Sequence, residues 1–258
     1  MRLLPWIILA VSTSMASADS STALDVLVAA YPDHLAGHSG NDLIWKDGTH
    51  MAISDGIQKK TFQQMLDNPD IDDQFAIKYP LGSTTRQPGT DEDPGRIRFE
   101  PFFSKMYGDC RKGETKASSK KIGWPSPSRQ TLTVTTVNGV ADRLVQIARE
   151  LQALPVKLQK YIFPSSGVFN CRPIAGTHRL SMHSYAAAID LNAQYGDYWR
   201  WAGGAEDGIR WKNRIPPEIV DVFERHGFVW GGKWYHFDTM HFEYRPEIIE
   251  LARRGWPK

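Results

Sequence analysis

Two short segments of the chain each place a histidine near an aspartate among small or apolar residues. Residues 181–192 (SMHSYAAAIDLN) contain His183 and Asp190, and residues 234–243 (WYHFDTMHFE) contain Asp238 and His241. A catalytic zinc ion takes three protein ligands, such as neutral imidazoles and carboxylates, and keeps a fourth position for water. If these side chains share a metal, the fold must bring two distant segments together.

The local spacing restricts how they could do so. Residues three or seven apart on a regular strand face opposite sides, so His183 and Asp190 cannot share a metal from one strand. A helix would align them, but the aromatic residues around Asp238 and His241 favour a strand. Spacing alone is weak evidence, because the chain has eight histidines. His183 and His241 are also compatible with hydrogen-bonded histidines beneath a sheet.

The composition limits the class of protein. With 258 residues, the chain is long enough for one large domain or two small ones. Hydrophobic residues make up 41% and charged residues 23%, which is typical of globular proteins and excludes a largely disordered chain or a multi-span membrane protein. The net charge of +2 is too small to indicate a nucleic-acid partner.

The first residues predict a secretory leader. Arg2 precedes an apolar run over residues 3–11, and Ala16-Ser17-Ala18 forms an A-x-A cleavage pattern. The alternative is a membrane anchor, but the run is about half of the roughly 20 residues that a spanning helix needs. We therefore expect residues 1–18 to be a signal peptide, and the mature protein to be periplasmic without stable membrane insertion.

The chain has two cysteines, Cys110 and Cys171. In an oxidising compartment two cysteines most often pair, so we expect a disulfide. The alternative is a nucleophilic cysteine, since Cys171 is close in sequence to His178 and His183.

Local patterns predict several elements. Apolar residues that repeat at three and four positions predict a helix over 140–154, and Gly227 fits the end of a second helix over 217–226. We expect a basic, flexible surface loop over 111–121, because lysines and arginines dominate it. The other expected elements are a short helix over 19–31, a strand–turn–strand over 41–57, helical turns over 61–67, irregular chain over 68–95 and a strand over 131–137.

Residues 165–245 resemble the VanY-like zinc peptidases, a family of D-alanyl-D-alanine carboxypeptidases and L-alanyl-D-glutamate endopeptidases. The pattern of that family is S-x-H-x-x-G-x-A-x-D, followed further along the chain by (D/E)-x-x-H. Ser181, His183, Ala188 and Asp190 match the first part, and Asp238 and His241 match the second. One position departs from the pattern, because Ala186 stands where the family has glycine. If the backbone there needs a positive φ, alanine costs roughly 1 kcal/mol.

The resemblance implies an α+β fold, in which a small antiparallel sheet carries a zinc site and is flanked by helices, as in hedgehog and DD-peptidase domains. It implies a turn after His183, a strand that carries Asp190, and a loop that places Asp238 just before a strand beginning near His241. On this basis residues 126–258 form the zinc peptidase domain. Residues 19–125 form a family-specific N-terminal region, an irregular extension that packs on the core.

The resemblance also implies roles for the side chains. His183, Asp190 and His241 hold one zinc ion per chain, and Asp238 acts as general base. Arg172 stabilises the oxyanion or grips a substrate carboxylate, with Arg179 as a competitor, and Ser181 either binds substrate or only stabilises a turn.

The implied substrate is a peptide of peptidoglycan, either a stem or a cross-link, cut by an endopeptidase or a D,D-carboxypeptidase. The bond and the oligomeric state stay open. The alternatives are a zinc-containing cell-wall binding module without catalysis, and a hydrolase with a cysteine or serine nucleophile.

Overall fold

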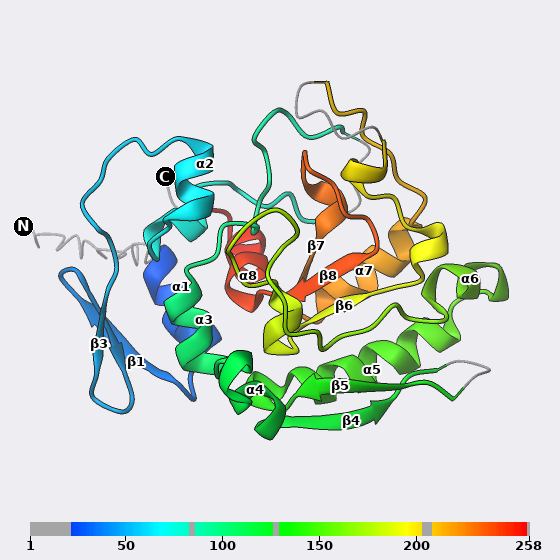
Figure 1. Ribbon diagram of the computed structural model, residues 1–258, viewed down its shortest axis with the longest axis horizontal. Coiled ribbons are helices and arrows are strands. Elements are labelled where there is room, and N and C mark those ends of the chain that lie inside the picture. Colours follow the sequence, from blue (N-terminus) through cyan, green and yellow to red (C-terminus); the bar gives the residue numbers. More distant parts are fainter. Residues whose placement is uncertain (1–21, 83–85, 126–128, 203–207, 257–258) are drawn as a thin grey trace, which may run out of the picture.

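The computed structural model describes residues 22–82, 86–125, 129–202 and 208–256. The described part of the chain forms an α+β fold with helices and three small antiparallel sheets (Figure 1). The predicted signal peptide lies outside the described residues. Within the described part, no helix is long and apolar enough to cross a membrane.

The N-terminal part begins with a helix and a three-stranded meander. Thr22 caps α1 (Ala23–Ala30) through a capping box with Asp25. The strands β1 (Leu35–Ser39), β2 (Asp42–Trp45) and β3 (His50–Ala52) pair in sequence order. Two helices follow, α2 (Phe62–Asp67) and α3 (Glu100–Tyr107). This confirms the expected strand–turn–strand over 41–57 and the helical turns over 61–67.

A hairpin and a long helix make up the next layer, along the lower edge of Figure 1. Strands β4 (Ser119–Gly123) and β5 (Thr131–Thr135) pair, and α5 (Val140–Ala153) packs against both, as its apolar periodicity predicts. The expectation of a flexible loop over 111–121 is wrong. This segment contains the short helix α4 (Glu114–Ala117) and most of β4, and Thr115 is buried.

The central sheet has the strand order β6-β8-β7, formed by β6 (Ala188–Asp190), β7 (Phe228–Trp230) and β8 (His241–Tyr244). Pairing of β6 with β8 places Asp190 directly opposite His241. Helices α7 (Pro217–Arg225) and α8 (Pro246–Arg254) pack against β7, and the short α6 (Gln159–Ile162) packs against α5. Gly227 ends α7 with φ 86°, as its sequence position predicts.

One hydrophobic core joins both ends of the chain. It includes Leu27 and Phe103 from the N-terminal part, and Leu144 and Phe242 from the C-terminal part. The Tyr31 hydroxyl donates a buried hydrogen bond of 2.6 Å to Glu247 on α8. Segments on either side of residue 125 therefore pack together, and the N-terminal region can contribute side chains to the centre of the molecule.

Candidate metal centre

His183 lies on a tight turn that the local sequence builds. The turn is a 3-10 helix over Met182–Tyr185, and the Ser181 hydroxyl caps it by accepting a hydrogen bond of 3.4 Å from the His183 amide. Ala186 ends the turn with φ 52°. The position where the family has glycine therefore needs a left-handed backbone. This turn lets the chain reverse after His183 and enter β6.

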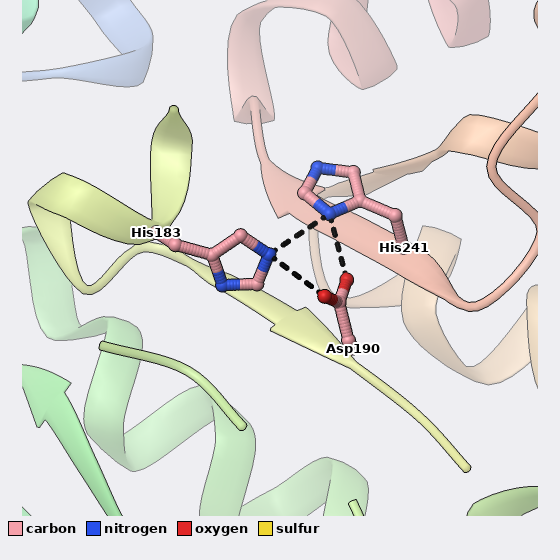
Figure 2. A group of neighbouring side chains, drawn as sticks. All are labelled: His183, Asp190 and His241. Atoms are coloured by element: carbon pink, nitrogen blue, oxygen red, sulfur yellow. Dashed lines mark hydrogen bonds and ion pairs between the residues drawn. The ribbon is translucent and has the colours of Figure 1, made fainter. Parts of the chain in front are cut away.

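Asp190 and His241 come from paired strands, so their side chains share one face of the sheet. His241 Nδ1 lies 2.9 Å from Asp190 Oδ1, and His183 Nε2 lies 3.2 Å from Asp190 Oδ2. The two facing imidazole nitrogens, His183 Nε2 and His241 Nδ1, are 3.2 Å apart. Figure 2 shows the three side chains pointing toward one another. The fold thus brings together the three predicted ligands, which form a group that could hold a metal ion.

The outer nitrogens of both imidazoles already have partners. His183 Nδ1 lies 2.6 Å from the Val168 carbonyl oxygen, and His241 Nε2 lies 3.2 Å from Glu243 Oε2. Each outer nitrogen therefore donates its N–H to an acceptor, which leaves a lone pair on each inner nitrogen of the neutral rings. These two lone pairs and the Asp190 carboxylate face one another. Three acceptors in contact repel, so the arrangement needs a cation or an added proton.

The donor set and its dimensions fit zinc. Two imidazoles and one carboxylate form the usual protein ligand set of a catalytic zinc site. Zinc bonds of about 2.0–2.2 Å in a tetrahedron place the ligand atoms about 3.3–3.6 Å apart. The observed separations of 2.9–3.2 Å are slightly shorter, so a small outward movement of the side chains would admit the ion.

Protons compete for the same lone pairs. Burial opposes a charge on His241, but hydrogen bonds with Asp190 and Glu243 raise its pKa to about 10. Burial also opposes the charge on Asp190, yet His183 and His241 hold the pKa of that carboxyl far below its usual range. Without metal, His241 is therefore protonated. A metal ion would have to displace this proton in order to bind.

A buried carboxylate and an arginine hold His241 in place. Glu243 lies two residues after His241 on β8, so both side chains share one face, and Glu243 is fully buried. Arg98 binds Glu243 with two nitrogens, at 3.1 Å from Nε and 2.6 Å from Nη2 to Oε2. Burial alone would raise the pKa of Glu243, but Arg98 and His241 lower it to about 2. Glu243 therefore stays charged and fixes the orientation of the imidazole.

Asp238 lies in the loop just before β8, as expected. Its amide donates to the Gly231 carbonyl at 3.0 Å, and a Cβ on Gly231 would come within 2.6 Å of the Asp238 carbonyl oxygen. Glycine is thus required for this close approach. Asp238 Oδ1 is buried and has no hydrogen-bond partner within the described residues. Burial and the nearby Asp190 charge raise the pKa of Asp238 to about 6, which suits a group that exchanges protons near neutral pH.

One cleft of about 500 Å³ is lined by His183, Asp190, Asp238 and His241. Arg172 and Ser181 line it too, whereas Arg179 lines a neighbouring pocket. Ser184 accepts from the Arg172 amide at 3.0 Å and donates to its carbonyl at 2.9 Å, so the backbone of Arg172 is fixed beside the His183 turn. Its side chain is exposed toward the cleft.

The two cysteines form a disulfide, with the Cα atoms of Cys110 and Cys171 5.7 Å apart. The bridge ties Cys171, the residue next to Arg172, to the short 3-10 helix Cys110–Lys112 that follows α3. Neither cysteine is available as a nucleophile, which removes the cysteine-hydrolase alternative.

Two further residues near the site, Asp93 and Arg98, lie far in sequence from the segments that contain the predicted ligands. Asp93 is buried and accepts from the His236 amide at 3.0 Å, and it lies 2.8 Å from Nδ1 of the same residue. His236 lines the cleft. Arg98 and Asp93 precede α3 and reach the site only through tertiary packing. Local residue patterns do not predict their contacts with the site. For Glu243, the available sequence signal is its place two residues after His241, on the same face of a strand.

Comparison with known proteins gives one match. Residues 175–244 match the family model described as D-alanyl-D-alanine carboxypeptidase. This match supports the zinc peptidase family and hence a peptidase. It covers all three predicted ligands and Asp238, but it excludes Arg172 and the whole N-terminal region. Neither a curated protein nor a solved structure was found to match the chain.

Proposed function

We propose that this protein is a zinc-dependent peptidase that hydrolyses peptide bonds in the stem peptides or cross-links of peptidoglycan, as an endopeptidase or a D,D-carboxypeptidase. The observation that carries the proposal is the convergence of three lone-pair donors beside a buried Asp238 oxygen, which has no hydrogen-bond partner among the described residues. The family match supports the same reaction class.

His183, Asp190 and His241 would hold the zinc ion. When bound, zinc supplies Lewis acidity, which polarises a carbonyl group and lowers the pKa of water. Asp238 Oδ1 accepts a proton from the attacking water and later delivers it to the leaving amine. Val168 and Glu243 keep the two imidazoles in the tautomers that leave their inner nitrogens unprotonated.

Arg172 is placed to act on the substrate. Its guanidinium carries a permanent positive charge and lines the cleft, so it stabilises negative charge on the carbonyl oxygen or binds a substrate carboxylate. Ser181 combines two roles in this proposal. Its hydroxyl caps the His183 turn, and because it also lines the cleft, it can donate to the substrate.

The proposed location is the periplasm. The predicted leader over residues 1–18 and the disulfide both support an oxidising compartment outside the cytoplasm. The proposed partner is the peptide part of peptidoglycan, with no nucleic acid and no stable membrane insertion after cleavage of the leader.

Mass spectrometry of peptidoglycan fragments incubated with the purified protein tests the proposal and identifies the bond. We expect cleavage of a stem peptide or cross-link that stops with chelator and returns with added Zn²⁺. Cleavage that persists in chelator would contradict the zinc mechanism. Stoichiometric zinc uptake without cleavage of any fragment would instead indicate a binding module.

A further inference from the structure

A second pocket opens beside the metal cleft. It has a volume of about 270 Å³ and shares Arg96, Arg98 and Ile174 with the lining of the cleft. It is smaller than the roughly 300–1,000 Å³ of pockets that take a whole drug-sized ligand. Its size suits one chemical group of a larger molecule bound in the cleft.

Three arginines line this pocket, and two of them have buried partners. Arg96 pairs with Asp93 at 2.5 Å, and Arg98 pairs with Glu243. Arg179 is different. Its nearest charged partner is Asp67, with Nε 3.5 Å from Oδ1, and the Asp67 side chain is 53% exposed. Arg179 Nε is buried and makes no hydrogen bond within the described part of the chain.

The electrostatic setting of Arg179 favours an anion. Burial and the neighbouring charge of Arg96 lower the pKa of Arg179 to about 10, although the charge of Asp67 opposes this shift. The other acid of the pocket, Glu100, already accepts hydrogen bonds from Arg111 and from the Leu180 amide. The positive charge of Arg179 is therefore poorly compensated in the protein alone.

We propose that this pocket is a subsite for a carboxylate of the peptide bound in the metal cleft, and that Arg179 is the residue that binds it. The planar guanidinium matches a carboxylate geometrically, and within the described ranges the buried Nε–H of Arg179 has no hydrogen-bond acceptor. Apolar side chains complete the walls, which suits the carbon chain of an amino acid; they include Leu66, Phe99 and Phe103. The identity of the peptide as a peptidoglycan stem rests on the proposed function.

The N-terminal region builds most of this subsite. Its lining includes residues 66–69, 96, 98–101 and 103 of this region, together with residues 174, 178–180 and 185 of the C-terminal part. The family match begins only at residue 175, so these N-terminal walls are an addition to the matched domain. Their role in this proposal is to select anionic peptides.

Binding measurements on an inactive protein test the subsite. The protein is the full chain with Asp238→Asn and added Zn²⁺, and the probes are three synthetic stem peptides: one with all carboxylates, one amidated at its C-terminus and one amidated at its side chains. Calorimetry gives the Kd of each. Adding Arg179→Gln should raise the Kd of the peptide with all carboxylates about 10- to 100-fold, which is the range expected for loss of a charged hydrogen bond. For one of the two amidated peptides, Arg179→Gln should leave the Kd unchanged. The carboxylate that is amidated in that peptide is the one that Arg179 binds.

Two further variants separate recognition from folding. Asp67→Asn removes the competing carboxylate, so it should tighten binding of the peptide with all carboxylates, which loss of structure would not do. Arg149→Gln changes an exposed arginine on α5 and should leave every Kd unchanged. An equal loss on all three peptides, or no loss on any, would overturn the subsite. If the predicted pattern appears but the unmodified protein cleaves no peptide, the subsite stands and the proposed function fails.

Discussion

Replacing Asp238 with Asn should stabilise the metal-free protein and should strongly lower the turnover of the zinc-loaded protein. The pKa of Asp238 rises from its ordinary 3.8 to about 6 in the fold, because burial and Asp190 disfavour its charge. Each pKa unit corresponds to about 1.4 kcal/mol, so the ionised carboxylate costs up to about 3 kcal/mol at pH 7. Asp238 retains some solvent contact, which screens the interaction, and we expect a gain of about 1–3 kcal/mol.

The gain must depend on pH with a definite sign. Below pH 3.8 the carboxyl is protonated in both the folded and unfolded states, so the variant and the parent differ little. Between pH 3.8 and about 6 the folded state keeps a proton that the unfolded state releases, so the parent loses stability as the pH rises. The difference is complete only about one pH unit above the folded-state pKa.

Urea unfolding followed by tryptophan fluorescence, in chelator at pH 4 to 8, measures this difference. With Zn²⁺ the same variant should keep its metal and lose about 10²–10⁴-fold in turnover. If the variant and the parent had equal free energies of unfolding at every pH, or differed by an amount that does not change with pH, the burial argument would be refuted. Full activity of the variant would refute the role of Asp238 as base.

Three other perturbations test separate parts of the structure. Glu243→Gln should weaken zinc binding about 10- to 100-fold in competition with a chromophoric chelator, because the charged partner of His241 is lost; unchanged affinity would exclude a positioning role. Ala186→Gly should stabilise the protein by up to about 1 kcal/mol in urea unfolding, because φ is 52° there; a clear loss of stability would show that the Ala186 methyl group matters more. Reduction of Cys110–Cys171, which spans 61 residues, should cost up to about 4 kcal/mol, and an unchanged melting temperature under reductant would contradict this.

The secondary structure was predictable where one face of an element is apolar over several turns. Val140, Leu144, Ile147 and Leu151 are all buried on α5, and their spacing alone indicates that helix. The segment over 111–121 has no such pattern, because β4 exposes Lys120 and Lys121 and buries only Ile122. Its strand exists because β5 pairs with it, and that pairing is not visible within the segment.

The three proposed metal ligands could be predicted because the motif of the resembling family marks His183, Asp190 and His241, whereas residue type and spacing alone are equally compatible with hydrogen-bonded histidines. Their geometry could not be read from spacing, since it depends on a turn at Ala186 and on the register that sets Asp190 opposite His241. The contacts of Arg98 and Asp93 with the site could not be predicted from the sequence. Both residues reach His241 or His236 across a tertiary contact, and local residue patterns do not specify such a contact.

Crystallography of the protein with one equivalent of zinc, using anomalous scattering at the zinc edge, tests the central claim most directly. We predict one peak per chain, about 2.0–2.2 Å from His183 Nε2, His241 Nδ1 and an Asp190 oxygen, with Asp238 beside the remaining position. Zinc bound elsewhere, or none bound while these three side chains keep hydrogen-bonding one another, would contradict the account.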